Sequence, residues 1–243
     1  MKMYDIIQHV KVTKFNPHHD HLGRFTSKNG GGGSGISVGI DQATSQGNSG
    51  GSSTSTETKQ QKISRLQGSS TSETIKNVEA EHRNNSIETL TVIDSQGRIT
   101  VMNDGDSVSC RISREDAWSS HNKAATHNHP STSNFSAKDI YTTVICEFSE
   151  FRATKRDGGA YVLKRMEGKK GNMSFYLDYE KHRDTAIKNA KAAMDSQGIA
   201  QKIKSGQMTQ EQANEQLNRL FAEEQGKWLS ENAEKYGYTY SEE

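Results

Sequence analysis

The chain has 243 residues, 30% of them hydrophobic, and a formal net charge of +1, so it accommodates one medium domain with solvated tails or two small domains. The near balance of 31 basic and 30 acidic residues gives no support for a nucleic-acid-binding surface, and we expect neither a membrane span nor a signal peptide because no apolar run is long enough. Cys110 and Cys146 are isolated, which is typical of reduced thiols in a soluble intracellular protein.

The N-terminal part divides into a short segment and a linker. The segment, residues 1–28, contains the sequence FNPHHDHLGRFT at residues 15–26. This sequence resembles a short segment of bacteriophage head-morphogenesis (minor capsid) proteins, and the resemblance implies an association with phage capsid proteins. Residues 29–70 are rich in glycine, serine and threonine and cannot bury enough surface to offset their ordering entropy. They are predicted to form a disordered linker.

Residues 71–178 are predicted to form the folded core. A helix is expected over residues 72–81, with Ile75 and Val78 on one face and either Ser72 or Thr71 as its cap. Strands are then expected at residues 88–93, 98–101 and 108–112, followed by a hairpin of residues 151–154 and 160–163. This order predicts an α/β (α+β) fold, with a central sheet flanked by helices.

Residues 179–243 are predicted to form helices that pack on this core. Alanine, lysine, glutamate and glutamine dominate, and residues 206–209 separate two helices. Thr209 and Gln212 have the spacing of a capping box, so the second helix should begin there. Its large apolar residues have helical spacing and dock either on the core or on a partner: Leu217, Leu220, Phe221 and Trp228.

Two histidines and an aspartate form a candidate metal site. On a strand, residues i and i+2 point to the same face, so His127 and His129 aim their rings at one point. Pro130 ends that strand, and Ser136 with Asp139 begins a helix, at the spacing of a capping box. Three protein ligands leave the fourth tetrahedral position open, which is the arrangement of a catalytic rather than a structural zinc site. A histidine-rich surface loop is the alternative.

The sequence HNHP at residues 127–130, followed by Ser136 and Asp139, resembles the signature of the JAB/MPN (JAMM) metalloprotease family. That signature is an upstream glutamate, His-x-His-Pro and Ser-x-x-Asp. The resemblance implies zinc-dependent hydrolysis of peptide or isopeptide bonds, with a metal-bound water as nucleophile and Ser136 as a donor to the oxyanion. The zinc ligands that it implies are His127, His129 and Asp139. Six residues separate His129 from Ser136, where the family has seven, so the loop between them is shorter.

Hydrolysis also requires a carboxylate that takes the proton of the water and delivers it to the leaving amine. Glu88 stands at the head of the first predicted strand, directly after the predicted helix, and the family glutamate occupies the same helix-to-strand location. Glu79 and Glu81, on the preceding helix, are the alternatives. Each of the three is otherwise a solvated surface residue.

We therefore expect a zinc metallopeptidase encoded by a phage or prophage, acting on a protein or peptide in the bacterial cytoplasm or attached to a virion. Neither nucleic acid nor a membrane is expected as a partner. The alternative is a non-catalytic phage assembly or interaction protein that retains the fold and the metal for stability. Catalysis is favoured because all three implied ligands are present.

Overall fold

The computed structural model describes residues 57–107, 109–130 and 133–243. The predicted phage-type segment, residues 1–28, and linker residues 29–56 lie outside this range. The strands are β1 (Thr89–Ile93), β2 (Ile99–Asp104), β3 (Ala124–Asn128), β4 (Glu150–Thr154), β5 (Ala160–Arg165) and β6 (Tyr238–Glu242). The helices are α1 (Lys59–Leu66), α2 (Thr71–His82), α3 (Arg114–Ser119), α4 (Ala137–Cys146), α5 (Met173–Ser196), α6 (Ile199–Lys204) and α7 (Gln210–Asn232), followed by a 3-10 turn (Ala233–Tyr236).

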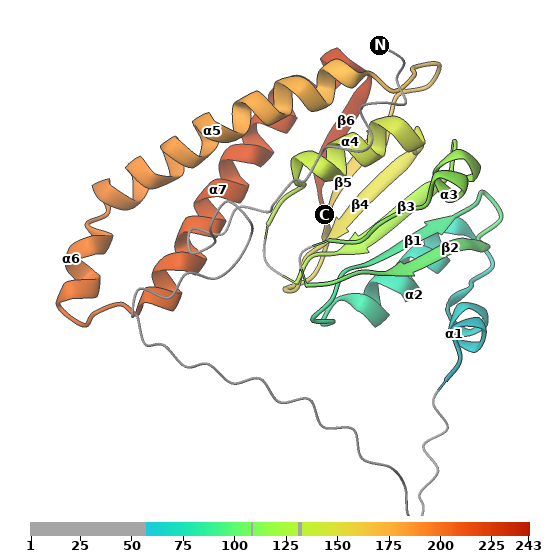
Figure 1. The fold of residues 1–243 in the computed structure, drawn as a ribbon, viewed down its shortest axis with the longest axis horizontal. Helices are drawn as coiled ribbons and strands as arrows, with labels where there is room; N and C mark the ends of the chain where they lie inside the picture. The colour runs from blue at the N-terminus through green and yellow to red at the C-terminus, as the bar shows by residue number, and fades with distance from the viewer. Residues whose placement is uncertain (1–56, 108, 131–132) are drawn as a thin grey trace, which may run out of the picture.

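The strands form one mixed sheet in the order β2-β1-β3-β4-β5-β6, which confirms the predicted α+β class (Figure 1). Among the six strands of the described residues, β3 and β4 are the one pair that is parallel. A parallel pair needs a crossover connection, and α4 supplies it. Because the other neighbouring strands are antiparallel, the ends of β3, β4 and β6 meet the starts of β1 and β5 at one end of the sheet.

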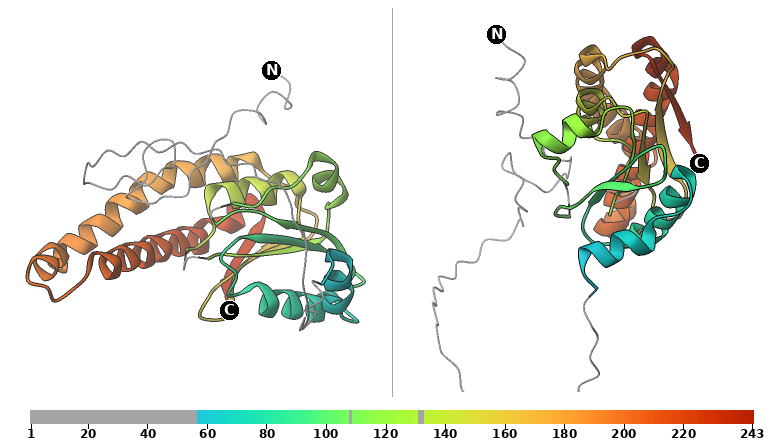
Figure 2. Two further views of the ribbon diagram at one scale, coloured as in Figure 1. Left: turned by 60° about the horizontal axis from the view of Figure 1, so that its bottom comes forward. Right: turned by 90° about the vertical axis from the view of Figure 1, so that its right-hand side faces the viewer.

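Helices cover both faces of the sheet, as the two views of Figure 2 show. On one face, α4, α5 and α7 pack on alternate strand residues, including Val92, Ala125 and Leu163. On the other face, α1 and α2 pack on the intervening residues, such as Ile93 and Ala124. The alternation of β-strand side chains therefore separates two hydrophobic cores.

Three local predictions are corrected near the start of the described chain. The predicted linker over residues 29–70 contains α1, which begins with a capping box at Thr58. Helix α2 is capped by Ser70, not by Thr71 or Ser72, because the Ser70 side chain accepts from the backbone of Glu73. The strand expected at residues 108–112 is absent over 109–112. The backbone N–H of Asp106 donates to the Ser109 carbonyl, and residues 109–112 do not pair with a strand of the sheet.

The C-terminal region is more closely joined to the core than predicted. Helix α5 already starts at Met173, and α7 begins at the predicted capping box of Thr209. Trp228 packs against the main core, whereas Leu217 and Phe221 pack against α5. Figure 1 shows α5 and α7 side by side, extending past the sheet. Strand β6 was not predicted, and it places the end of the predicted helical region, residues 179–243, within the sheet.

Candidate metal centre

The structure brings the three predicted ligands together at the end of β3. His127 lies on β3, His129 is the first residue after the end of β3, and Asp139 is in the first turn of α4. The two Nε2 atoms are 2.7 Å apart, and each lies 3.4 Å from an oxygen of Asp139. All three side chains are buried, and within the described residues they form the one group of histidine, cysteine and acidic side chains that could hold a metal ion.

The hydrogen bonds of the two rings fix which nitrogen carries the proton. Nδ1 of His127 lies 3.0 Å from the carbonyl oxygen of Arg152, and Nδ1 of His129 lies 2.7 Å from that of Ser133. A carbonyl oxygen only accepts, so both Nδ1 atoms donate. In the neutral rings, both Nε2 atoms then present lone pairs toward each other. Two lone pairs at this distance repel unless a cation stands between them, and backbone partners at the other nitrogen are typical of metal-binding histidines.

Asp139 is held by the helix that it helps to start. The backbone N–H of Ser136 donates to Oδ2 of Asp139 at 2.6 Å, and the backbone N–H of Asp139 donates to Oγ of Ser136 at 3.2 Å. This is the capping box that the sequence predicts. Burial raises the pKa of Asp139, but positive charge at His127 and His129 outweighs burial and holds it well below its usual range. A metal ion held between two neutral rings would supply the same charge. The site therefore presents a carboxylate anion to a cation.

The ring of His127 is also supported by aromatic packing. Phe151 stacks on it, with centroids 4.8 Å apart and an interplanar angle of 13°, and Phe135 stacks on Phe151 in turn. Neither phenylalanine was identified from the sequence, because no motif marks a residue that supports a ligand through contacts distant in sequence.

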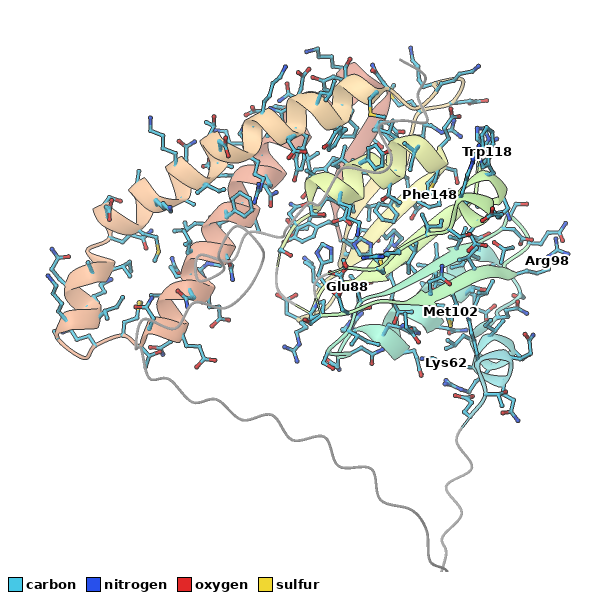
Figure 3. All side chains as sticks on the ribbon, in the orientation of Figure 1. Lys62, Glu88, Arg98, Met102, Trp118 and Phe148 are labelled. Carbon is cyan, nitrogen blue, oxygen red and sulfur yellow. The ribbon has the colours of Figure 1, made fainter. Side chains whose placement is uncertain are left out.

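Glu88 lies at the same end of the sheet as the ligands. Leu90 of β1 pairs with His127, and the Thr89 N–H donates to Oδ1 of Asn128, so continuing this antiparallel register places Glu88 opposite His129. Residues opposite each other in an antiparallel pair share a face. Glu88 is 1% exposed, and Figure 3 labels it at the start of β1.

The two alternative glutamates lie elsewhere. Glu79 is on the opposite face of the sheet, where it accepts hydrogen bonds from Thr126 at 3.2 Å and from Nε of Arg152 at 2.6 Å. Glu81 forms a hydrogen-bonded ion pair with Arg65 of α1. Because Thr126 and His127 alternate on β3, a carboxylate that contacts Thr126 is separated from the histidines by the sheet.

The donor set suits zinc, since two imidazole nitrogens and one carboxylate oxygen are common ligands of catalytic zinc. Comparisons with models of known protein families, with curated proteins and with solved structures give no match for this chain. None of the helices in the described parts of the chain is long and apolar enough to cross a membrane.

Proposed function

We propose that this protein is a zinc-dependent hydrolase of peptide or isopeptide bonds, similar in its site to the JAB/MPN family. His127, His129 and Asp139 would hold the metal. The observation that carries the proposal is the convergence of two buried Nε2 lone pairs and a carboxylate on one point, with both Nδ1 atoms committed to backbone carbonyls. When bound, Zn²⁺ supplies Lewis acidity that lowers the pKa of a water molecule toward neutrality.

Two further side chains have roles in this proposal. Glu88 shares a face with the ligands and would carry a proton on its carboxylate from the water to the leaving amine. Ser136 uses its Oγ as an acceptor from the backbone of Asp139. A hydroxyl has one hydrogen as well as its acceptor lone pairs, so Ser136 can still donate to an oxyanion that forms on the substrate.

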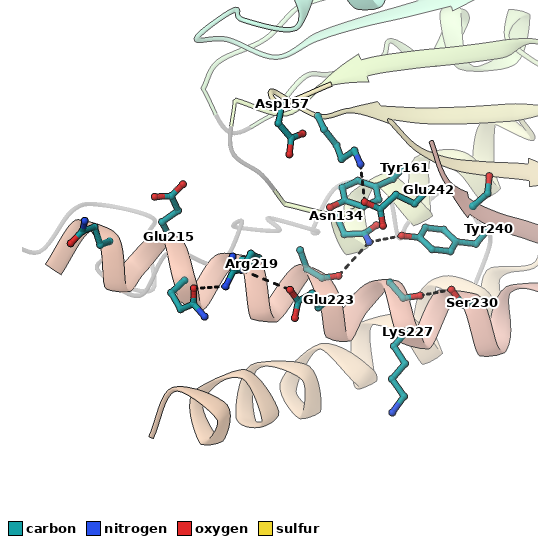
Figure 4. Close-up of a pocket in the computed structure, with 16 residues that line it drawn as sticks. Asn134, Asp157, Tyr161, Glu215, Arg219, Glu223, Lys227, Ser230, Tyr240 and Glu242 are labelled. Atoms are coloured by element: carbon teal, nitrogen blue, oxygen red, sulfur yellow. Dashed lines mark hydrogen bonds and ion pairs between the residues drawn. The ribbon is translucent and has the colours of Figure 1, made fainter. Parts of the chain in front are cut away.

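A cavity of about 830 Å³ lies near the same end of the sheet, between β5, β6 and α7 (Figure 4). Tyr161 of β5 lines this cavity and pairs with Ala153, which in turn pairs with His127. Paired residues share a face, so Tyr161 lies two strands from His127, at about 10 Å. Most lining side chains are charged or polar, including Lys155, Arg219 and Glu242. These features support a polar polypeptide as substrate, not an apolar molecule.

A second candidate function is a non-catalytic protein in which the metal stabilises the fold. The observation that favours it is burial, because His127 and His129 are each 1% exposed and Asp139 is 8% exposed. A catalytic metal has to be reached by its substrate, whereas a structural metal does not.

A cleavage assay with a matched pair of variants separates the two candidates. Zinc-loaded protein is incubated with proteome-derived peptides and with lysine-linked isopeptides, and new amino termini are identified by mass spectrometry. The wild type and Glu81→Gln, a change at an ion pair outside the site, should give the same products. Glu88→Gln should bind zinc and give none. Equal cleavage by Glu88→Gln would contradict the assigned role, and zinc binding without cleavage by the wild type would support the structural candidate.

A further inference from the structure

Phe135 connects the metal centre to the C-terminal helices. It lies in the loop between His129 and Asp139 and is fully buried. Its carbonyl oxygen accepts two hydrogen bonds from distant elements: one at 2.6 Å from Oη of Tyr179, on α5, and one at 3.2 Å from Nε2 of Gln225, on α7. Both donors are buried as well, so water does not compete for this carbonyl.

Phe135 influences the positions of the metal ligands through two sets of contacts. Its ring stacks on Phe151 with centroids 5.7 Å apart, and Phe151 stacks on the ring of His127. The next residue in the chain is Ser136, whose backbone N–H donates to the Asp139 carboxylate. A displacement of Phe135 would therefore change the position of a histidine ring and of a carboxylate at once.

The preceding residue, Asn134, is attached to the same C-terminal elements. Its Nδ2 donates to Oη of Tyr240 at 2.7 Å and to the carbonyl of Ala222 at 3.4 Å (Figure 4). Gly226 of α7 leaves room for this contact, because a Cβ there would lie within a tight 3.1 Å of both Nδ2 of Asn134 and Oη of Tyr240. The ligand loop, here residues 133–136, is thus held by side chains of α5, α7 and β6.

We propose that Tyr179 and Gln225 are positioning residues of the metal centre, which act through Phe135 to set the geometry of His127 and Asp139. This role rests on the metal site of the proposed function, but not on catalysis. Partners that orient metal ligands typically change metal affinity by 10–100-fold when removed. Tyr179 is one residue further from the metal, so we expect an effect of about tenfold, at the lower end of that range.

The test compares two tyrosine hydroxyls of the same region. Tyr179→Phe removes the bond to Phe135, whereas Tyr236→Phe removes a bond of 2.7 Å to Asp178 that does not involve the ligand loop. Zinc affinity is measured by competition with a chelator under conditions in which each apo-protein is folded, as judged by circular dichroism. The visible absorption bands of the Co²⁺-substituted proteins report the ligand geometry independently of any activity.

The expected result is about tenfold weaker zinc binding and altered Co²⁺ bands for Tyr179→Phe, with both properties unchanged in Tyr236→Phe. Gln225→Met, which keeps the length of the side chain and removes the donor, should change both properties in the same direction. If Tyr179→Phe does not fold, Gln225→Met is compared with the wild type and Tyr236→Phe in its place. If the folded variants bind zinc with wild-type affinity and show wild-type Co²⁺ bands, the positioning role is overturned, while the proposed function stands. Failure of the wild type to bind metal would overturn it together with the proposed function.

Discussion

The carboxylate of Glu79 lies 2.6 Å from Nε of Arg152, on the face of the sheet opposite His127. Arg152 also contacts Glu150 at 2.9 Å and Glu243 at 2.7 Å, so one buried guanidinium joins α2, β4 and the end of β6. Glu79 therefore belongs to a structural network, and Glu88 is the one of the three candidate glutamates that lies on the face of the metal centre.

The first prediction concerns this division of roles. Glu79→Gln should lower the free energy of unfolding by about 2 kcal/mol, since it removes a buried carboxylate that accepts from Arg152 while Glu150 and Glu243 still pair with the guanidinium. Its zinc content should be that of the wild type. Glu81→Gln breaks a more exposed pair and should cost under about 1 kcal/mol. Urea unfolding and metal analysis check both variants. Loss of zinc in Glu79→Gln would show that the opposite face also contributes to the site.

The second prediction concerns Ser136. Ser136→Ala removes a helix cap and should cost about 1 kcal/mol of stability. If Ser136 also donates to an oxyanion, hydrolysis should fall by about 10²–10³-fold while zinc stays bound. Thr209→Ala removes an equivalent capping box at the start of α7 and is the matched control. It should show a similar loss of stability with no loss of hydrolysis. Equal hydrolytic activity in the two variants would mean that Ser136 caps the helix but does not donate to the oxyanion.

The third prediction follows from His82 on the α2 face of the sheet. It is 2% exposed, neither ring nitrogen has a hydrogen-bond partner among the described residues, and burial lowers its pKa from 6.5 to about 4. Above pH 6.5 the ring is neutral in both the folded and unfolded states, and it contributes no pH dependence. As pH falls from 6.5 to about 4, the unfolded state binds a proton that the folded state does not, so stability is lost, up to about 3 kcal/mol.

His82→Leu should remove this part of the pH dependence. The difference in unfolding free energy between about pH 7 and pH 4.5 should shrink by roughly 2–3 kcal/mol relative to the wild type. The comparison uses metal-free protein, so that acid release of metal does not contribute. An unchanged difference would mean that His82 does not remain neutral in the folded protein.

The fourth prediction concerns removal of the metal. A ligand present at about 1,000 times its dissociation constant stabilises the folded state by about 4 kcal/mol. For a domain of this size, that corresponds to a rise in melting temperature of roughly 10 °C. Addition of a chelator should therefore lower the melting temperature of the wild type by this amount. Asp139→Asn should respond much less. A chelator effect of the same size in Asp139→Asn would place the bound metal elsewhere.

The local parts of the site could be predicted from the sequence. Strand alternation brings His127 and His129 to one point, and the spacing of Ser136 and Asp139 gives a capping box, since both depend only on neighbouring residues. The choice among the three glutamates required the packing of α2, which no local pattern specifies. Contacts such as Tyr179 with Phe135 join residues 44 positions apart and leave no sequence signal.

Contacts between residues distant in sequence also limited the prediction of the fold. Hydrophobic alternation indicated β1, β4 and β5, but β6 follows a long helix and only its first residue is fully buried. Its pairing with β5 joins residues about 75–80 positions apart in the sequence, which no local pattern specifies. The start of α5 at Met173 depends on Asn172, whose side chain accepts from the backbone of Ser174.

The metal content of the purified protein decides whether His127, His129 and Asp139 hold a metal ion. Inductively coupled plasma mass spectrometry of protein purified without chelator should give about one zinc ion per wild-type chain. A His127→Ala/His129→Ala double variant with the circular dichroism spectrum of the folded protein should give none. A folded wild type that binds no divalent metal, even after incubation with zinc, would contradict the account.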